Sequence, residues 1–316
     1  MSEVSKKEVL LFSGTSNPDL SQKIAKNIGL SLGKVDISRF SNGEIYVRFE
    51  ESVRGADVFV IQTLSNAIND SLMELLIMVD ALKRASAAAI TAVIPHYGYA
   101  RQDKKSKARE PITAKLIADL LSIAGINRLA TVDLHADSIQ GFYNVPVDHL
   151  TAMNIIAKYF KAKKLKDLVV VSPDVGRVKT AKKFADLLRA DLAILHKSRP
   201  RANVAEITHV VGEVSGKTAL VVDDMIDTAG TMCEAGKAII ENGAIGAYAA
   251  ATHPILSGPA VQRLDEAPFK EVVFTDSIPV SKEKMLKKFK TLTIASLLAK
   301  MIHNIHNDES VSSLFE

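Results

Sequence analysis

Two residue patterns alternate along nearly the whole chain, and this alternation constrains the fold more than any other feature. Short apolar runs such as "EVLLFSG" (8–14) and "ADVFVIQT" (56–63) are typical of strands, whereas "NPDLSQKIAKNIG" (17–29) places apolar residues at helical spacing and stops at Gly29. The rhythm resumes with "DLVVVSPD" (167–174) and a helix over 176–189. Strands separated by helices predict an α/β fold in which a mainly parallel sheet is covered by helices on both faces.

The length and the rhythm indicate how the chain is divided. With 316 residues the chain is long enough for two domains. We expect the hinge near residues 146–165, where "VPVDHL" leads into a lysine-rich helix. The segments "AAITAVIPHYGYA" and "NGAIGAYAAATHPILSG" both follow a long helix and both end in a turn with His and Pro. This parallel suggests two similar halves.

Composition excludes several classes of protein. A net charge of +4 is too small to indicate nucleic-acid binding but suits small anionic substrates, and the absence of Trp argues against a base-stacking surface. Cys233 is the only cysteine, so neither an internal disulfide nor a zinc cluster can form. The sequence lacks a run of about 18 apolar residues and a signal-peptide pattern, so we expect no membrane span and a cytoplasmic location.

The segment "LVVDDMIDTAGTM" (220–232) carries the clearest chemical signal. It reads as a buried strand followed by Asp223, Asp224 and Asp227 and a turn of small residues before a helix. Small residues at a helix start let backbone N–H groups approach an anion, and carboxylates beside it can accept hydrogen bonds from vicinal hydroxyls. Together they indicate a phosphorylated sugar. The alternative is a helix N-cap with solvated acids.

Two further strand ends carry residues suited to phosphate chemistry. Asp133 and His135 lie at the end of the predicted strand "LATVDLHAD", and strand alternation would turn both to one face, where they could bind a divalent cation. A satisfied polar cluster is the alternative. Lys197 and Arg199 follow the strand "DLAIL" and could stabilise charge in phosphoryl transfer, or could form a solvated basic turn.

Several long motifs resemble one enzyme family. "VVDDMIDTAGT" is similar to the phosphoribosyl pyrophosphate loop of the type I phosphoribosyltransferase fold. "TVDLHADSIQGFYNVPVDHL" (131–150), "FSNGE" (40–44), "YARQDKK" (99–105) and the tail "SVSSLF" (310–315) resemble ribose-phosphate pyrophosphokinases. Because these motifs occur in the family's order over essentially the whole chain, the chain is identified as a member of that family.

The resemblance implies a fold and a reaction. The fold would be two similar phosphoribosyltransferase-like domains, an N-terminal domain over 1–150 with the ATP motifs, joined by the returning tail 300–316, and a C-terminal domain over 151–299 with the ribose 5-phosphate loop. The reaction would transfer the pyrophosphoryl group of ATP to the 1-hydroxyl of ribose 5-phosphate, giving phosphoribosyl pyrophosphate and AMP for nucleotide biosynthesis.

The resemblance also implies roles for particular residues. Lys197 and Arg199 would be the catalytic pair on a mobile loop, and His135 and Asp174 would bind Mg²⁺. The residues implied in ATP binding are Phe40, Asn42, Gly43, Glu44, Arg101 and Gln102. Those implied in ribose 5-phosphate binding are Arg199, Asp223, Asp224, Asp227, Thr228, Ala229, Gly230 and Thr231.

Assembly and regulation are likewise implied by the resemblance. Family members are commonly homo-hexamers that phosphate activates and ADP inhibits, so we expect a homo-oligomer, namely a hexamer. We expect neither nucleic acid nor a membrane as a partner.

Three positions depart from the family pattern. Ser138 and Asn144 differ from the common residues near the metal motif, and Arg177 stands where glycine is common, which raises the local positive charge.

Two rival functions stay open at the level of the sequence. A phosphoribosyltransferase would share the 220–232 loop but would not need "FSNGE" and "YARQD". A non-catalytic regulatory homologue would keep the fold and lose residues such as Lys197 and Arg199, both of which are present.

Overall fold

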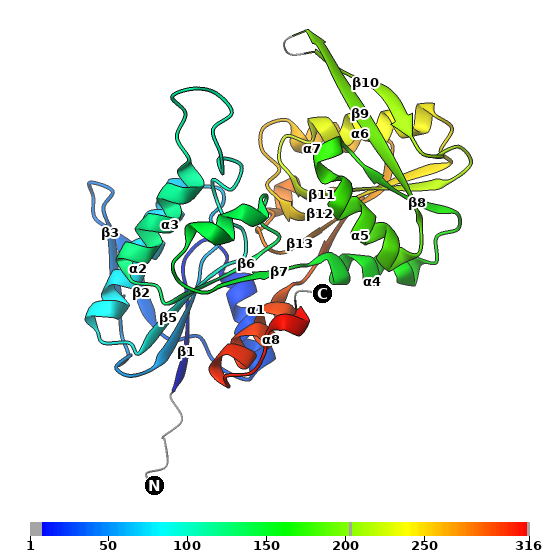
Figure 1. Cartoon of the computed structure of the whole chain (residues 1–316). Coiled ribbons are helices and arrows are strands. Elements are labelled where there is room, and N and C mark those ends of the chain that lie inside the picture. The colour runs from blue at the N-terminus through cyan, green and yellow to red at the C-terminus, as the bar shows by residue number, and fades with distance from the viewer. Residues whose placement is uncertain (1–7, 202–203, 315–316) are drawn as a thin grey trace. The chain divides into compact units, whose positions relative to one another are not determined.

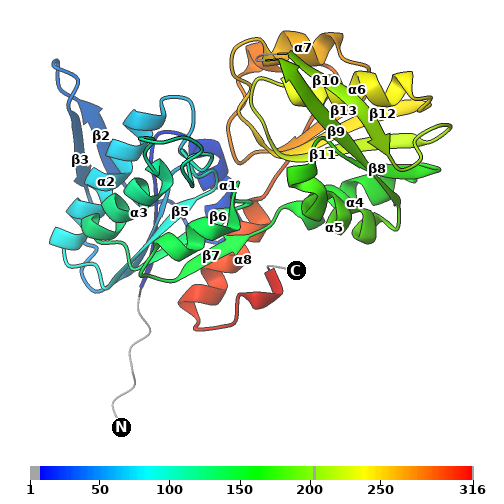
Figure 2. The ribbon, with the colours of Figure 1, turned by 45° about the horizontal axis from the view of Figure 1, so that its top comes forward.

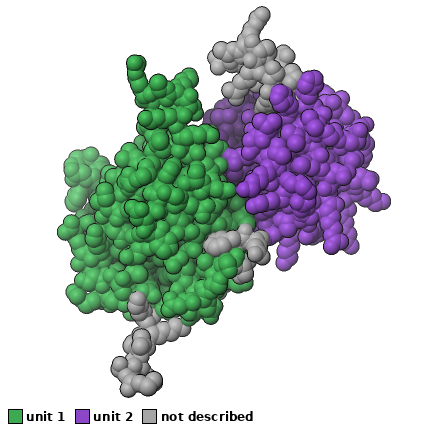
Figure 3. Space-filling view, viewed as in Figure 1, with its two compact units in different colours: residues 1–151, 294–316 green, residues 152–293 purple. Residues whose placement is uncertain are grey.

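The chain folds into two compact units, each built on its own sheet (Figures 1 and 3). A computed structural model describes residues 8–201 and 204–314. One unit contains the chain up to Thr151 together with the segment from Ile294 onward, and the other is Ala152–Thr293. The expectation of an α/β fold with mainly parallel sheets is confirmed.

The first unit contains a five-stranded sheet in which every neighbouring pair is parallel. Its strands in spatial order are β1 (Val9–Ser13), β4 (Asp57–Ile61), β5 (Ala89–Ile94), β6 (Arg128–Val132) and β7 (Val147–Leu150). A separate antiparallel hairpin is formed by β2 (Val35–Arg39) and β3 (Ile45–Phe49). The first-unit helices are α1 (Pro18–Ile28), α2 (Ile68–Arg84), α3 (Thr113–Ala124) and α8 (Ala295–His306).

The helices of the first unit cover both faces of its sheet (Figure 2). Apolar side chains of α2 and α3, such as Leu75 and Leu121, are buried against Val58 and Val60 of β4. The C-terminal helix α8 returns to lie beside α1 (Figure 1). The last helix of the chain therefore completes a unit that begins at its first strand.

The second unit has a seven-stranded sheet that is parallel except for its β9–β10 edge pair. In spatial order the strands are β10 (Val204–Val211), β9 (Asp191–Arg201), β8 (Leu168–Ser172), β11 (Thr218–Ile226), β12 (Gly246–Pro254), β13 (Phe269–Thr275) and β14 (Phe289–Leu292). Its helices are α4 (Met153–Lys163), α5 (Val178–Leu188), α6 (Gly230–Glu241) and α7 (Ala260–Glu266). Short 3₁₀ turns in the two units are Asp137–Phe142, Val175–Arg177, Lys282–Lys284 and Ser312–Leu314.

Strand β11 shows why this sheet is apolar on both faces. Ala219 and Val221 pack in the cluster that contains α6 and α7, whereas Leu220 and Val222 pack with α4 and α5. Successive side chains of a strand point to opposite faces, so a doubly covered strand must be apolar at every position. The run "ALVV" (219–222) in the middle of the sheet meets this requirement.

Helix ends were predicted with mixed success. Gly29 ends α1 in the left-handed conformation, with φ of 81°, as its position after the helical pattern predicts. The sequence "NDSLMELLIMVDALKRASA" (69–87) has helical spacing and predicts a helix capped by Asn69 or Asp70, and this prediction of the cap is wrong. The helix begins at Ile68 after Ala67, which makes no side-chain cap, so Asn69 and Asp70 lie in its first turn.

A buried carboxylate holds the end of β1 in place. Glu74 of α2 is 3% exposed. Its Oε1 accepts hydrogen bonds from the Thr15 backbone N–H and from Gln62 Nε2, both at 2.7 Å, and its Oε2 accepts one from the Thr15 hydroxyl at 2.7 Å. The Gln62 Oε1 in turn accepts from Ser16. A Cβ at Gly14 would lie 2.3 Å from that oxygen, so the loop requires glycine there.

The substitution Glu74→Ala is expected to destabilise the protein by about 3 kcal/mol, because it leaves several buried donors without acceptors. Urea unfolding followed by circular dichroism measures the loss. Met73→Ala, at an exposed neighbour on the same helix, is the control and should change stability by less than about 1 kcal/mol. Equal losses for the two variants would contradict this role of Glu74.

Across residues 8–201 and 204–314, the structure contains no helix that is both long and apolar enough to cross a membrane.

Candidate active site

The strand order of the second unit reverses at β8. From β8 the chain goes through α5 to β9 on one side, whereas β11 lies on the other side of β8. Helix α5 packs on one face of the sheet and α6 on the opposite face. In open α/β sheets, ligands bind at the carboxyl ends of the strands beside such a reversal. The segments that leave β8 and β11 there contain the predicted phosphate and sugar residues.

The acidic end of β11 lies at this position. The strand includes Asp223 and Asp224 and ends at Ile226, slightly later than the sequence pattern suggests. Asp227, Thr228 and Ala229 then form the connection, and Gly230 is the first residue of α6. The predicted phosphate loop therefore spans the strand end, a three-residue connection and the first turn of the helix.

The start of α6 has the features of an anion site. Ala229 adopts the left-handed conformation with φ of 58°, and α6 has no side-chain cap. The first backbone N–H groups of a helix lack partners within the helix and carry the positive end of its dipole. Arg263 Nη1 donates to the Thr228 carbonyl at 3.0 Å, and the Ser257 N–H donates to the Asp227 carbonyl at 2.9 Å. These two hydrogen bonds hold the carbonyl groups of the connection between β11 and α6 in place.

Asp223 and Asp224 form ion pairs with one arginine. Arg177 Nε lies 3.3 Å from Asp223 Oδ1, and Arg177 Nη2 lies 3.0 Å from Asp224 Oδ2. The Asp224 backbone N–H also donates to Asp223 Oδ1 at 2.8 Å. Burial raises the pKa of Asp223 well above its usual value, the adjacent Asp224 carboxyl raises it further, and Arg177 opposes both effects.

Asp174, predicted to bind Mg²⁺, caps the turn that follows β8. Its Oδ1 accepts hydrogen bonds from the backbone N–H groups of Gly176 at 2.8 Å and Arg177 at 3.2 Å. Its Oδ2 has no hydrogen-bond partner among the described residues. Magnesium is usually held by one or two carboxylates together with water and substrate phosphates. The half-buried Asp174 carboxylate therefore fits as one ligand of a magnesium ion.

His135, the other predicted metal ligand, lies in the first unit, in the loop after β6. Strand β6 ends at Val132, and Asp133 has φ of 40°, so the expectation that Asp133 and His135 share one strand face is wrong. The Leu134 N–H donates to His149 Nε2 at 2.8 Å, so this hydrogen bond ties the loop after β6 to strand β7. Both Asp133 and His135 are half-buried. Within the described part of the chain, no three His, Cys, Asp or Glu side chains form a metal-binding group.

Lys197 and Arg199 lie on a strand rather than in a loop. Strand β9 continues to Arg201 and pairs with β10, with Lys197 opposite Ile207. The placement of these two residues after a strand, in a loop, is therefore wrong. The reason is non-local, because the pairing with β10 extends β9 beyond its apolar part.

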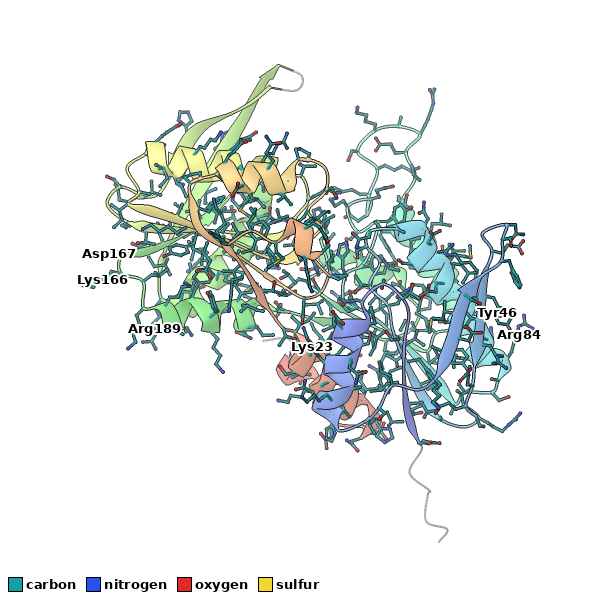
Figure 4. All side chains as sticks on the ribbon, turned by 180° about the vertical axis from the view of Figure 1, so that it is seen from behind. Lys23, Tyr46, Arg84, Lys166, Asp167 and Arg189 are labelled. Carbon is teal, nitrogen blue, oxygen red and sulfur yellow. The ribbon has the colours of Figure 1, made fainter. Side chains whose placement is uncertain are left out.

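The predicted ATP residues of the first unit occupy two turns. Phe40, Asn42, Gly43 and Glu44 form the turn of the β2–β3 hairpin, where Asn42 Oδ1 accepts from the Glu44 N–H at 3.2 Å. Phe40 is 56% exposed and meets Tyr46 edge to face, with ring centroids 5.8 Å apart (Tyr46 is labelled in Figure 4). An exposed aromatic ring is available to stack on a base.

Arg101 and Gln102 lie in the loop after β5. Gln102 Oε1 accepts from the Thr113 hydroxyl at 2.6 Å, which ties the loop to the start of α3. Arg101 is exposed.

The start of α2 contacts residues beside both turns through Asn69 and Asp70. Arg39 Nη2 lies 3.2 Å from Asp70 Oδ2, and the Tyr99 hydroxyl donates to Asn69 Oδ1. A pocket at the start of α2 is lined by residues 66–70 and Tyr99. In the sequence, Asn69 and Asp70 open the motif "NDSLMELLIM", which resembles ribose-phosphate pyrophosphokinases, but the pattern gave these two residues only a capping role.

Cys233 lies at the start of α6 and is 7% exposed. Burial raises the pKa of its thiol to about 11, so the thiol is neutral at lower pH. We expect Ellman's reagent to modify the native protein at about pH 8 roughly a hundredfold more slowly than the urea-unfolded protein, because the thiolate is the reactive form. Similar rates for the native and unfolded protein would contradict this burial.

The fold and the site define a class: a two-unit α/β protein in which a strand of the second sheet carries two adjacent carboxylates and leads through a short connection into an uncapped helix. Comparison with known proteins gives the family. The family model for the N-terminal domain of ribose phosphate pyrophosphokinase matches residues 9–125, and that for the phosphoribosyl synthetase-associated domain matches residues 202–316. The chain belongs to the ribose-phosphate pyrophosphokinase family.

Individual relatives are similar in sequence to this chain over nearly its full length. A ribose-phosphate pyrophosphokinase of Caldanaerobacter subterraneus subsp. tengcongensis is 57% identical over 306 residues, which are 96% of this chain and 97% of the relative. The Bacillus subtilis enzyme is 53% identical, covering 98% of each chain. The crystal structure of phosphoribosylpyrophosphate synthetase from Mycobacterium smegmatis is 47% identical, with a TM-score of 0.91 over 96% of this chain and 100% of that one.

Proposed function

We propose that the protein transfers the β,γ-pyrophosphoryl group of ATP to the 1-hydroxyl of ribose 5-phosphate, forming phosphoribosyl pyrophosphate and AMP. One observation carries the proposal. Two adjacent carboxylates, Asp223 and Asp224, lie on β11 directly before an uncapped helix start, at the point where the strand order reverses. This combination suits a vicinal diol beside a phosphate, and the names of the full-length relatives supply the reaction.

Ribose 5-phosphate binds through two parts of this segment. The N–H groups at the start of α6, within the segment 227–231, bind the 5-phosphate. Asp223 and Asp224 accept hydrogen bonds from the ribose hydroxyls, directly or through a metal ion. The sugar is then oriented with its 1-hydroxyl toward the transferred group, and orientation removes much of the entropic barrier to the reaction.

Mg²⁺ is the proposed cofactor. The family resemblance proposes Asp174 in the second unit and His135 in the first unit each as a magnesium ligand. When bound, Mg²⁺ offsets negative charge on the phosphates of the substrates. Asp174 is suited to this role by its half-buried carboxylate, in which Oδ1 is fixed by the backbone of Gly176 and Arg177.

The remaining roles are proposed on the family resemblance. Lys197 and Arg199 stabilise charge on the transferred group and on the AMP leaving oxygen, and Arg199 also contributes to ribose 5-phosphate binding. Phe40 stacks on adenine, and the polar groups of 42–44 and 101–102 bind the rest of ATP. The protein assembles as a homo-hexamer that phosphate activates and ADP inhibits. The cytoplasmic location stays a prediction.

Nucleotide analysis tests the proposed function. The purified protein is incubated with ATP, Mg²⁺ and phosphate, with and without ribose 5-phosphate, and the nucleotides are separated by chromatography. We expect AMP to accumulate only when ribose 5-phosphate is present. Formation of ADP, or binding of ribose 5-phosphate without turnover, would favour a different kinase or a regulatory subunit.

A further inference from the structure

A single arginine bridges the two carboxylates that are proposed to bind the ribose diol. Arg177 contacts Asp223 at 3.3 Å and Asp224 at 3.0 Å. The three side chains are largely buried, with exposed fractions of 17% for Arg177, 17% for Asp223 and 8% for Asp224. We refer to these three residues as the Arg177 cluster.

The backbone holds Arg177 in this position. It is the last residue of the 3₁₀ turn Val175–Arg177, and its N–H donates to Asp174 Oδ1 at 3.2 Å. The turn leaves β8, which pairs directly with β11, the strand of the two acids. Arg177 therefore contacts the Asp174 carboxylate with its backbone N–H group and the carboxylates of Asp223 and Asp224 with its side chain.

In the Arg177 cluster, the positive charge of Arg177 lies beside two negative carboxylates, and it favours their charged form. Two adjacent buried carboxylates repel each other, and without a nearby cation one of them tends to take up a proton. A protonated carboxyl is a weaker acceptor for a sugar hydroxyl than a carboxylate. Each carboxylate has about four acceptor positions, so it can pair with a guanidinium and still accept hydroxyl hydrogen bonds.

We propose that Arg177 acts as a resident cation for the diol site, so that ribose 5-phosphate binds Asp223 and Asp224 without a divalent cation between them and these carboxylates. Arg177 is a positioning residue, because it acts through the two carboxylates. The inference rests on the proposed function and deepens it: it separates sugar binding from the magnesium requirement of the transfer step.

Calorimetric titration of the full-length protein with ribose 5-phosphate, without ATP, tests the inference. Each titration is run with EDTA and with excess Mg²⁺. For the unmodified protein we expect dissociation constants that agree within about threefold between the two conditions. For Arg177→Gln we expect binding roughly tenfold or more weaker in EDTA, with most of the loss restored by Mg²⁺. Arg177→Lys, which keeps the charge, should recover part of the affinity in EDTA.

The matched control is Arg189→Gln. Arg189 is an exposed arginine at the C-cap of α5, the helix that follows the 3₁₀ turn of Arg177 (Figure 4). It should bind as the unmodified protein does in both conditions. Three results would overturn the inference: loss of binding by the unmodified protein in EDTA, unchanged binding by Arg177→Gln in EDTA, or an equal loss by Arg177→Gln with and without Mg²⁺. The last would mark a purely structural role.

Failure of the inference and failure of the proposed function are distinguishable. If only the inference fails, the unmodified protein still forms AMP from ATP and ribose 5-phosphate with Mg²⁺ present. If the proposed function fails, AMP does not form, whatever the metal dependence of sugar binding.

Discussion

Replacing Lys197 by alanine is expected to lower kcat by about a thousandfold while the dissociation constant of ribose 5-phosphate changes by less than about threefold. The reason is that the proposed role of this lysine lies in the transition state, where negative charge grows on the transferred group and on the leaving oxygen. Rapid-quench measurement of AMP formation gives the rate, and calorimetry gives the binding constant.

The control for this variant is Lys166→Ala, which removes an exposed lysine from the same unit (Figure 4). It should leave both quantities unchanged. If Lys197→Ala weakened ribose 5-phosphate binding as much as it lowered turnover, Lys197 would be a ground-state binding residue.

Replacing Asp224 by asparagine is expected to weaken ribose 5-phosphate binding roughly tenfold to a hundredfold, because a charged acceptor of a hydroxyl hydrogen bond is lost. The amide would also place its NH₂ group or its carbonyl against Arg177 Nη2, which now lies 3.0 Å from a carboxylate oxygen. ATP affinity should stay within about threefold, because the proposed ATP residues belong to the other unit. Titrations with each ligand measure both constants.

Asp265→Asn is the matched control for Asp224→Asn. Asp265 is an exposed carboxylate on α7 of the same unit, so its loss should not change either binding constant. Unchanged ribose 5-phosphate affinity in Asp224→Asn would contradict the assignment of the β11 carboxylates to the sugar.

The fold could be predicted from sequence where local patterns determine it. In α1, the helical spacing of Leu20 and Ile24 predicted the buried face, and Gly29 predicted its end. It could not be predicted where contacts between distant segments determine the structure. Asn69 and Asp70 resemble capping residues, but Tyr99 and Arg39 engage their side chains in the first turn of α2. Likewise, β9 extends to Arg201 only because β10 pairs with it.

The candidate site shows the same limit. The segment 223–231 was found from sequence because its acids, its small residues and its helix start are contiguous. Arg177 was noted as an added positive charge, but its contacts with Asp223 and Asp224 depend on β8 lying beside β11. A single sequence does not reveal that strand order. The left-handed backbone conformation of Asp133 could not be predicted either. The residue pattern continues the strand through Asp133 and His135, whereas the structure ends the strand at Val132.

The central claim is that a pyrophosphoryl group moves as one unit from ATP to the 1-hydroxyl of ribose 5-phosphate. Phosphorus NMR of the complete reaction with Mg²⁺ tests it most directly. The account predicts equal amounts of AMP and of a ribose product with two mutually coupled diphosphate signals in addition to its 5-phosphate signal. ADP together with a ribose product that carries a second single phosphate would contradict the account.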